Sequence, residues 1–389
     1  MKAQTIQIME MCSAFVKAGS DVELLVPKNP VNKRVSEKEV FDCYGVDQNF
    51  QIRFLPCFTV SNRLGAPTSV VAALNSVRKS KPNFCYVRNI WAVPFISILR
   101  IPILFESHEF HYAHPLYGKL ARSIVKRYVK TGSIRLVICI SDALRNLWLR
   151  SGCPEEKTVL APDGVDLNKF SDLPEKEALR AELGLPLNMK ICCYCGHLYN
   201  DRGIEDILAA AIDLKKLLFL IVGGHPKDVE KYKILAKSLN IKNVTFTGFV
   251  SHFYVPRYLR SADILLMPHS KRCRIWYCMS PLKMFEYLAA GRPIIASDFP
   301  STREVLKHGE DSILIKHDSR SELVRAIQRI LNDDALYSAL SIKALNKAKG
   351  FSWVNRGRHI LAAISKKERP NSSDDKESRE ISGPSFSDS

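Results

Sequence analysis

The stretch SPLKMFEYLAAGRP, residues 280–293, decides the fold of this chain because it reads as one helix with both of its ends marked. Ser280 is a good N-cap, and Pro281 suits the first helical position, where its missing N–H costs nothing. Gly291 suits the left-handed residue that commonly ends a helix. Apolar, strand-like runs, ILLM and IIAS, precede and follow the stretch. The sequence here predicts a strand, a long loop, a helix and a second strand.

Lys283 and Glu286 are three residues apart, so they share one face near the start of this predicted helix. The backbone N–H groups and the dipole at a helix start favour an anion. One interpretation of the pair is an exposed ion pair that contributes about 0.2–0.5 kcal/mol. The other is a binding site for an anionic ligand, and the spacing alone leaves both open.

The composition indicates a two-domain globular protein with a surplus of positive charge. The 389 residues are too many for one comfortable core, and 46% of them are hydrophobic, which is ordinary for a globular chain. No apolar run reaches the ~18 residues of a membrane span. The formal net charge of +17 favours a polyanionic partner such as an anionic membrane surface, a sugar diphosphate or a nucleic acid. Because no helix-turn-helix, RNP or zinc-finger pattern occurs, we expect no nucleic-acid partner.

Eleven cysteines, several of them inside apolar strand-like runs, are typical of a reduced, cytoplasmic protein. Cys192 and Cys195 have the CxxC spacing of some metal and redox sites. However, the pair lies within a strand pattern and has no second CxxC, so we interpret these residues as small hydrophobes.

Strand and helix patterns alternate along the chain, which predicts an α/β protein with largely parallel sheets. Two Rossmann-like, doubly wound domains that face each other across a cleft are the natural architecture. The predicted parts are an N-terminal domain at 1–171, a C-terminal domain at 172–352, a helix at 353–367 that crosses back to the first domain, and a disordered tail at 368–389.

The string PLKMFEYLAAGRPIIASD, residues 281–298, closely resembles the donor-binding signature of the family 4 retaining glycosyltransferases, which have the GT-B fold. The resemblance extends over nearly all residues from Gln4 to about Ser365. It implies a nucleotide-diphospho-sugar as co-substrate, with neither a metal nor another cofactor. In this family the equivalent of Glu286 binds the ribose and the helix start faces the diphosphate, where Lys283 lies.

The segment GHLYNDRGI, residues 196–204, follows a strand pattern and opens a helix. It resembles the family's diphosphate-binding loop, with Gly196 near the phosphates. Arg202 takes the position of the family lysine, and His197 takes that of the family arginine. An ordinary loop with an exposed arginine is the alternative. Four residues of two further loops resemble those that line the base and the ribose: Gly223, Gly224, Phe249 and Val250.

Cys278 marks a departure from the family pattern. Family members carry two glutamates eight positions apart, of which Glu286 is the second, and the first falls on Cys278. A thiol cannot supply the same carboxylate, so we interpret Cys278 as a spectator. We expect the backbone of the loop Tyr277, Cys278, Met279 and Ser280 to face the diphosphate or the donor sugar instead.

His108 closes an apolar run at its C-terminal end, where ligands bind in open α/β sheets. It resembles the family histidine that lies beside the reacting sugar, and Glu106 or Glu109 could orient its ring. The resemblance makes His108 and Glu286 the candidate catalytic residues. The alternative for His108 is an ordinary loop histidine.

The chain begins almost directly with a helix pattern, whereas a doubly wound domain begins with a strand and a tight loop. Family members similarly carry a strand and a Gly-containing loop before this helix. We therefore expect the first strand of the N-terminal domain to be absent from this sequence. Its absence would leave neighbouring strand edges unpaired.

The segment 116–130 carries five basic residues and no acidic one, with apolar residues at intervals of four. Such a basic amphipathic helix suits a peripheral contact with the anionic inner face of a membrane, and the acceptor would then be lipid-linked. The alternative is a solvated helix that packs its apolar stripe on the sheet.

These features together predict a retaining glycosyltransferase that moves a sugar from a nucleotide-diphospho-sugar to a glycan or lipid-linked acceptor. Two alternatives share the fold. One is a sugar-nucleotide epimerase, which would need several acid and base carboxylates in the cleft. The other is a protein that binds a sugar nucleotide but has lost catalysis, an interpretation motivated by Cys278 and by the missing strand.

Overall fold

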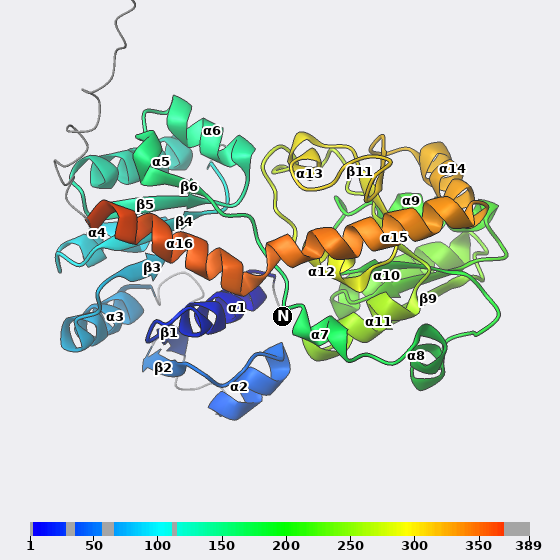
Figure 1. Ribbon diagram of the computed structural model, residues 1–389, viewed down its shortest axis with the longest axis horizontal. Coiled ribbons are helices and arrows are strands. Elements are labelled where there is room, and N and C mark those ends of the chain that lie inside the picture. The colour runs from blue at the N-terminus through cyan, green and yellow to red at the C-terminus, as the bar shows by residue number, and fades with distance from the viewer. Residues whose placement is uncertain (1–2, 29–35, 57–65, 111–114, 369–389) are drawn as a thin grey trace, which may run out of the picture.

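The computed structural model describes residues 3–28, 36–56, 66–110 and 115–368, and two α/β halves lie side by side in it (Figure 1). The predicted tail falls almost wholly outside these residues. The elements of the first half are α1 (Ala3–Lys17), β1 (Glu23–Lys28), α2 (Glu37–Tyr44), β2 (Gln51–Pro56), α3 (Ala66–Ser80), β3 (Cys85–Val87), the 3-10 turn η1 (Ile90–Ala92), α4 (Val93–Ser97), β4 (Ile103–Ser107), α5 (Pro115–Lys130), β5 (Ile134–Cys139), α6 (Asp142–Arg150), the 3-10 turn η2 (Glu155–Lys157) and β6 (Thr158–Leu160).

The second half is built on one parallel sheet of six strands in the order β12-β11-β10-β7-β8-β9. Its strand order reverses at β7, which lies between β10 and β8. The elements that lead into and complete this half are α7 (Asn168–Ser171), α8 (Lys176–Glu182), β7 (Ile191–Cys195), α9 (Ile204–Asp213), β8 (Leu218–Val222), α10 (Pro226–Ser238), β9 (Val244–Gly248), the 3-10 turn η3 (His252–Tyr254), α11 (Val255–Ser261), β10 (Ile264–Met267), α12 (Leu282–Ala290), β11 (Ile294–Ser297), α13 (Pro300–Arg303), β12 (Ile313–Ile315), α14 (Arg320–Leu331) and α15 (Asp334–Ala348). Ligands of such sheets bind outside the carboxyl ends of the strands at this kind of switch point.

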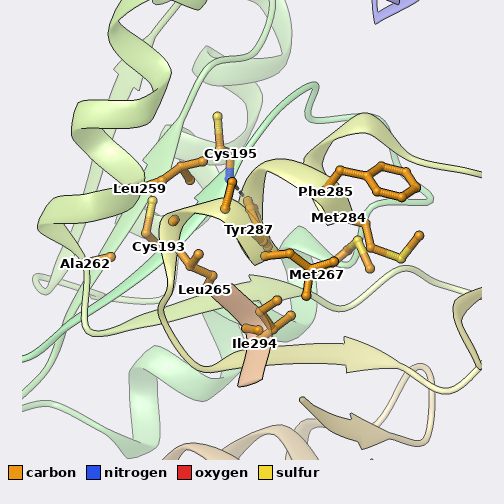
Figure 2. Packing of buried hydrophobic residues seen from close by; sticks show 14 of the residues in the cluster. Cys193, Cys195, Leu259, Ala262, Leu265, Met267, Met284, Phe285, Tyr287 and Ile294 are labelled. Atoms are coloured by element: carbon orange, nitrogen blue, oxygen red, sulfur yellow. Dashed lines mark hydrogen bonds between the residues drawn. The ribbon is translucent and has the colours of Figure 1, made fainter. Parts of the chain in front are cut away.

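Tyr287 fastens α12 to the middle of this sheet. Its ring is fully buried, the Cys195 backbone N–H donates to its hydroxyl at 2.8 Å, and the hydroxyl donates to the Leu266 carbonyl at 3.2 Å. Figure 2 shows Tyr287 among the apolar side chains of β7, β10 and α12. Because a buried tyrosine hydroxyl needs a partner, these two bonds fix the helix on the ends of β7 and β10.

The predicted start of α12 is wrong by one residue. Pro281, with extended backbone, is the N-cap, and no side chain caps the helix. The Ser280 hydroxyl instead accepts a hydrogen bond from the Asp163 backbone N–H at 3.2 Å. The serine is therefore used in a contact with the distant segment that follows β6, and the first N–H groups of α12 receive no cap from it. The predicted end is confirmed, since Gly291 has left-handed backbone with φ of 61°.

The first half contains two sheets instead of one. β1 and β2 form a parallel pair, and β3, β4, β5 and β6 form a separate parallel sheet in that order. Within the described residues, no strand joins β1 to β3. The single doubly wound sheet expected for this half is thus divided. The expected absence of a first strand before α1 stays a prediction, since the described residues begin at Ala3.

The last helix, α16 (Trp353–Glu368), runs from the end of α15 back over the first half (Figure 1). It packs against α1, and a Cβ atom at Gly357 would lie 3.3 Å from the Ala14 carbonyl oxygen. Trp353 and Ile360 share a buried cluster with Phe15 and with strand residues of the first half. The first and last helices of the described chain therefore form one layer.

Candidate active site

The two charged residues of α12 do not pair with each other. Glu286 Oε1 lies 2.6 Å from His252 Nε2 of η3, while Lys283 Nζ is buried without a hydrogen-bond partner. Burial alone would raise the pKa of Glu286, but the His252 contact and nearby positive charges lower it. The interpretation of Lys283 and Glu286 as an exposed ion pair is therefore wrong. Sequence reasoning gave no role to His252, since nothing at this single position signals its contact with Glu286.

Lys283 is an unusual lysine in its surroundings. Its Nζ lies 3.9 Å from the centroid of the Tyr194 ring, and a Cβ atom at Gly196 would lie only 2.8 Å from it. Burial, and then the charge of Arg202, lower the pKa of Lys283 to about 7. A buried amine without an acceptor is costly, so this group is poised for a ligand that carries negative charge.

His269 lies in the same cluster, just after β10. It is 1% exposed, and neither ring nitrogen has a hydrogen-bond partner. Burial, then the charges of Lys283 and Arg202, hold the pKa of His269 well below its ordinary value. A neutral imidazole keeps one N–H donor, so His269 adds a second unused donor beside Lys283. Sequence analysis missed it, although its place after a buried strand of a parallel sheet was a usable signal.

Two glycine-containing loops bring backbone close to this cluster. Gly203 begins α9 with φ of 72°, and a Cβ atom there would lie 1.7 Å from the Pro268 carbonyl oxygen, so no other residue fits. Gly223 has φ of 97° and a similar conflict with the Gly196 carbonyl oxygen at 2.7 Å. The neighbouring Gly224 also has positive φ. These approaches hold the ends of β7, β8 and β10 together.

The two other side chains predicted for the diphosphate loop, Arg202 and His197, each contact a neighbouring residue of that loop. Arg202 Nε lies 3.4 Å from Asp201 Oδ1, and its side chain is 23% exposed. His197 stacks on Tyr199, with ring centroids 5.0 Å apart. Of the predicted base and ribose residues, Phe249 is 59% exposed, whereas Val250 packs against the core.

The loop 277–280 fastens the two halves together. The Cys278 thiol is buried within the core of the first half, and burial raises its pKa to about 12. The Ser141 hydroxyl donates to the Cys278 carbonyl at 2.9 Å, and Met279 is buried in a small cluster with Phe299. The Cys278 thiol is therefore neutral and packed away from solvent.

His108 follows β4 in the first half, and its side chain is 26% exposed. Its Nε2 lies 3.0 Å from Oε1 of Glu106, one of the two glutamates considered as partners of its ring. Glu106 accepts hydrogen bonds from Gln7 Nε2 at 2.6 Å, from Arg356 at 2.8 Å and from the Tyr86 hydroxyl, whereas His108 Nε2 has no hydrogen-bond partner among the described residues. Sequence reasoning did not find Arg356, whose contact with Glu106 spans 250 residues.

Within the part of the chain that the structure describes, no three His, Cys, Asp or Glu side chains are grouped so that they could hold a metal ion. The polar groups near α12 are instead donors: an amine, an imidazole, a guanidinium and backbone N–H groups. This donor set suits an anion with several oxygen atoms.

The divided α/β fold and the loops at the switch point have the arrangement of the GT-B class. The chain belongs to the family 4, group 1 glycosyltransferases. Residues 175–347 match the family model for glycosyl transferases group 1, and residues 4–169 match that for glycosyltransferase family 4. The family predicted from the string at 281–298 is confirmed.

Individual relatives are distant. An uncharacterised glycosyltransferase of Methanocaldococcus jannaschii is 25% identical over 222 residues, which are 56% of this chain and 55% of the relative. Alpha-galactosylglucosyldiacylglycerol synthase of Streptococcus pneumoniae is 26% identical over 240 residues, 59% of this chain and 61% of the relative. The chain thus spans between about half and two thirds of the length of such curated relatives.

Solved structures agree on the fold. The crystal structure of HepE from Anabaena in complex with UDP and glucose superposes with a TM-score of 0.74 and 18% identity. The superposition covers 94% of this chain and 96% of HepE. The predicted class, two α/β units with parallel sheets in the GT-B arrangement, is confirmed.

Proposed function

We propose that this protein transfers a sugar, with retention of anomeric configuration, from a nucleotide-diphospho-sugar to a glycan or lipid-linked acceptor. The observation that supports it most directly is the pair of buried, unused donors at Lys283 and His269, beside the glycine loops at the switch point of the second sheet. A diphosphate would supply the acceptors that both side chains lack. The solved relative HepE binds UDP, which has this group.

The second half would hold the donor. Lys283 and Arg202, with the backbone near Gly196 and His197, would neutralise the diphosphate as its bond to the sugar breaks. Glu286 would hold the ribose hydroxyls once it exchanges or shares its His252 contact. The loops at 223–224 and 249–250 would line the ribose and base.

The first half would present the acceptor, with residues 1–171 as its domain and residues 172–352 as the donor domain. His108 would place the donor sugar. The acceptor oxygen would attack on the face from which the diphosphate leaves, and the departing phosphate oxygen would take the acceptor proton. No protein nucleophile is needed in this route, which suits a buried and neutral Cys278. We propose no metal in it.

A peripheral membrane contact would fit a lipid-linked acceptor, such as the name of the Streptococcus pneumoniae relative implies for that protein. The sequence prediction for α5 needs one correction, because its buried stripe is Ala121, Val125 and Val129, while Leu120 is 53% exposed. The turn η1 and the helices α4 and α5 contact one another, and each carries exposed apolar side chains. The apolar members are Trp91, Phe95, Ile98, Tyr117 and Leu120.

Exposed apolar side chains next to a helix that also carries exposed lysines suit an anionic bilayer. No helix of the described residues is both long enough and apolar enough to cross a membrane. Sedimentation with phosphatidylglycerol vesicles, compared with phosphatidylcholine vesicles, tests the contact. Equal recovery with both kinds of vesicle would contradict it.

The proposed function is tested by a thermal-shift panel of UDP-, GDP-, ADP- and TDP-sugars and the corresponding diphosphates. We expect one base to stabilise the protein and its sugar conjugate to be consumed with an acceptor extract. If no nucleoside diphosphate raises the melting temperature, the proposal fails.

A further inference from the structure

A buried polar network links α16 to the candidate catalytic histidine of the first half. The Glu106 carboxylate is fully buried, and the Arg356 side chain is 3% exposed. Arg356 Nη2 donates to Glu106 Oε1 at 2.8 Å, and the same oxygen lies 3.0 Å from His108 Nε2. One carboxylate oxygen therefore contacts a residue near the end of the chain and the histidine after β4.

Arg356 is itself held firmly in place. Its Nε donates to the Ala161 and Pro162 carbonyl oxygens at 3.1 and 2.9 Å, and another of its nitrogens contacts the Tyr86 hydroxyl. The planar guanidinium thus joins α16 to β3, β4 and the segment after β6. A side chain with so many fixed partners has little freedom, so it can fix the carboxylate that it binds.

The surroundings of Glu106 stabilise its ionised form. Burial alone would raise its pKa, but Arg356 and then His108 more than offset this, and the net pKa is lowered. An ionised carboxylate 3.0 Å from a ring nitrogen favours a proton on that nitrogen. In the neutral ring, a proton on Nε2 would leave Nδ1 as an acceptor.

We propose that Arg356 is a positioning residue that acts through Glu106 to hold His108 as the Nε2–H tautomer, so that Nδ1 can accept a hydrogen bond from a sugar hydroxyl. The sugar contact rests on the proposed function, whereas the fixed tautomer does not. Arg356 would thereby give α16, the helix that crosses between the halves, a role in the active site. The contact between His108 and Glu106 acts through charge and proximity, because Nε2 lies 3.0 Å from the carboxylate oxygen without the geometry of a hydrogen bond.

Histidine side-chain NMR tests this without any substrate. The protein, with its ten histidines labelled with ¹⁵N, is measured at pH 8.5, and His108 is assigned by its loss in His108→Gln. We expect nitrogen shifts of a single Nε2–H tautomer in the wild type. Arg356→Met should give averaged shifts of mixed tautomers, whereas Arg356→Lys, which keeps the charge, should retain most of the wild-type pattern.

The matched control is Glu10→Gln. It alters a different buried ion pair, in which Glu10 of α1 lies 2.6 Å from Lys169 of α7. It should leave the His108 signals unchanged. If Arg356→Met does not fold, the double variant Glu106→Leu/Arg356→Met removes both buried charges and serves in its place. An Nδ1–H tautomer in the wild type, or an unchanged Nε2–H tautomer without Arg356, would overturn the inference. A failed nucleotide panel would affect only the proposed function.

Discussion

The two halves of the molecule use buried charge in opposite ways. In the first half, the Glu106 carboxylate is surrounded by Gln7, Tyr86 and Arg356. In the second half, Lys283 is also buried, yet its Nζ has no hydrogen-bond partner. A satisfied charge stabilises a scaffold, whereas an unsatisfied one adds free energy to the empty state that a ligand can remove. The comparison indicates that the first half is assembled in advance and that the second is completed by its ligand.

The largest expected effect comes from breaking the buried Glu106–Arg356 pair of the first half. Arg356→Met should lower the free energy of unfolding by about 3–5 kcal/mol, because it leaves Glu106 as an unpaired buried charge. Denaturant unfolding followed by circular dichroism measures this change. Glu106→Leu/Arg356→Met should recover much of the loss, and a double variant no more stable than the single one would argue against the buried pair as the cause.

Removing the buried amine of Lys283 in the second half should change the free energy of unfolding in the opposite direction. Lys283→Met should raise the free energy of unfolding of the empty protein by about 1–3 kcal/mol, since it removes a buried amine without a partner. It should also weaken nucleoside diphosphate binding roughly 10- to 100-fold, because a hydrogen bond to a charged group contributes about 1.5–3 kcal/mol. Unfolding and calorimetry measure the two effects. A destabilised variant would show that Lys283 has a structural partner.

The pH dependence of stability should reveal the cost of burying Lys283 without a mutation. The pKa of Lys283 is lowered from 10.5 to about 7 in the folded chain, so between these values the unfolded chain binds more protons. Stability of the empty protein should therefore rise with pH in this window, by up to about 1.4 kcal/mol per unit from this group. Lys283→Met should lack that contribution when the two unfolding curves are compared from pH 7 to 9.5.

The same shift predicts proton uptake when an anion binds. A diphosphate beside Lys283 favours the charged amine, so binding at pH 8.5 should draw a proton from the buffer. Calorimetry in two buffers of different ionisation enthalpy measures this uptake. Lys283→Arg, which stays charged, is the control and should show none from this position, while equal uptake in both proteins would place the proton elsewhere.

The smallest effect is expected at Cys278. Cys278→Ala should leave transfer within about threefold of the wild type and lower stability by roughly 1 kcal/mol, because the thiol packs in a core and takes no part in the proposed chemistry. Turnover of the donor found in the nucleotide panel measures the first effect. A loss of more than about a hundredfold would restore the catalytic thiol as a hypothesis.

Sequence alone predicted the features that depend on local patterns. The alternation of strands and helices, the end of α12 at Gly291 and the family string around Glu286 all lie within short windows. What it could not predict depends on distant packing. The Ser280 hydroxyl accepts a hydrogen bond from the Asp163 backbone instead of capping α12. His252 contacts Glu286, which is 34 residues away in the sequence. The cost of burying Lys283 and His269 likewise follows from how β7, β10 and α12 meet, which no window of sequence contains.

The layer formed by α1 and α16 has a consequence for the order in which the chain can fold during synthesis. Helix α1 is synthesised long before its partner α16, so the second half can be complete while the first still exposes Phe15 and Met11. We expect nascent chains stopped before residue 353 to be protease-sensitive in the first half and resistant in the second. Limited proteolysis of stalled chains would show whether the half made first is indeed the half finished last.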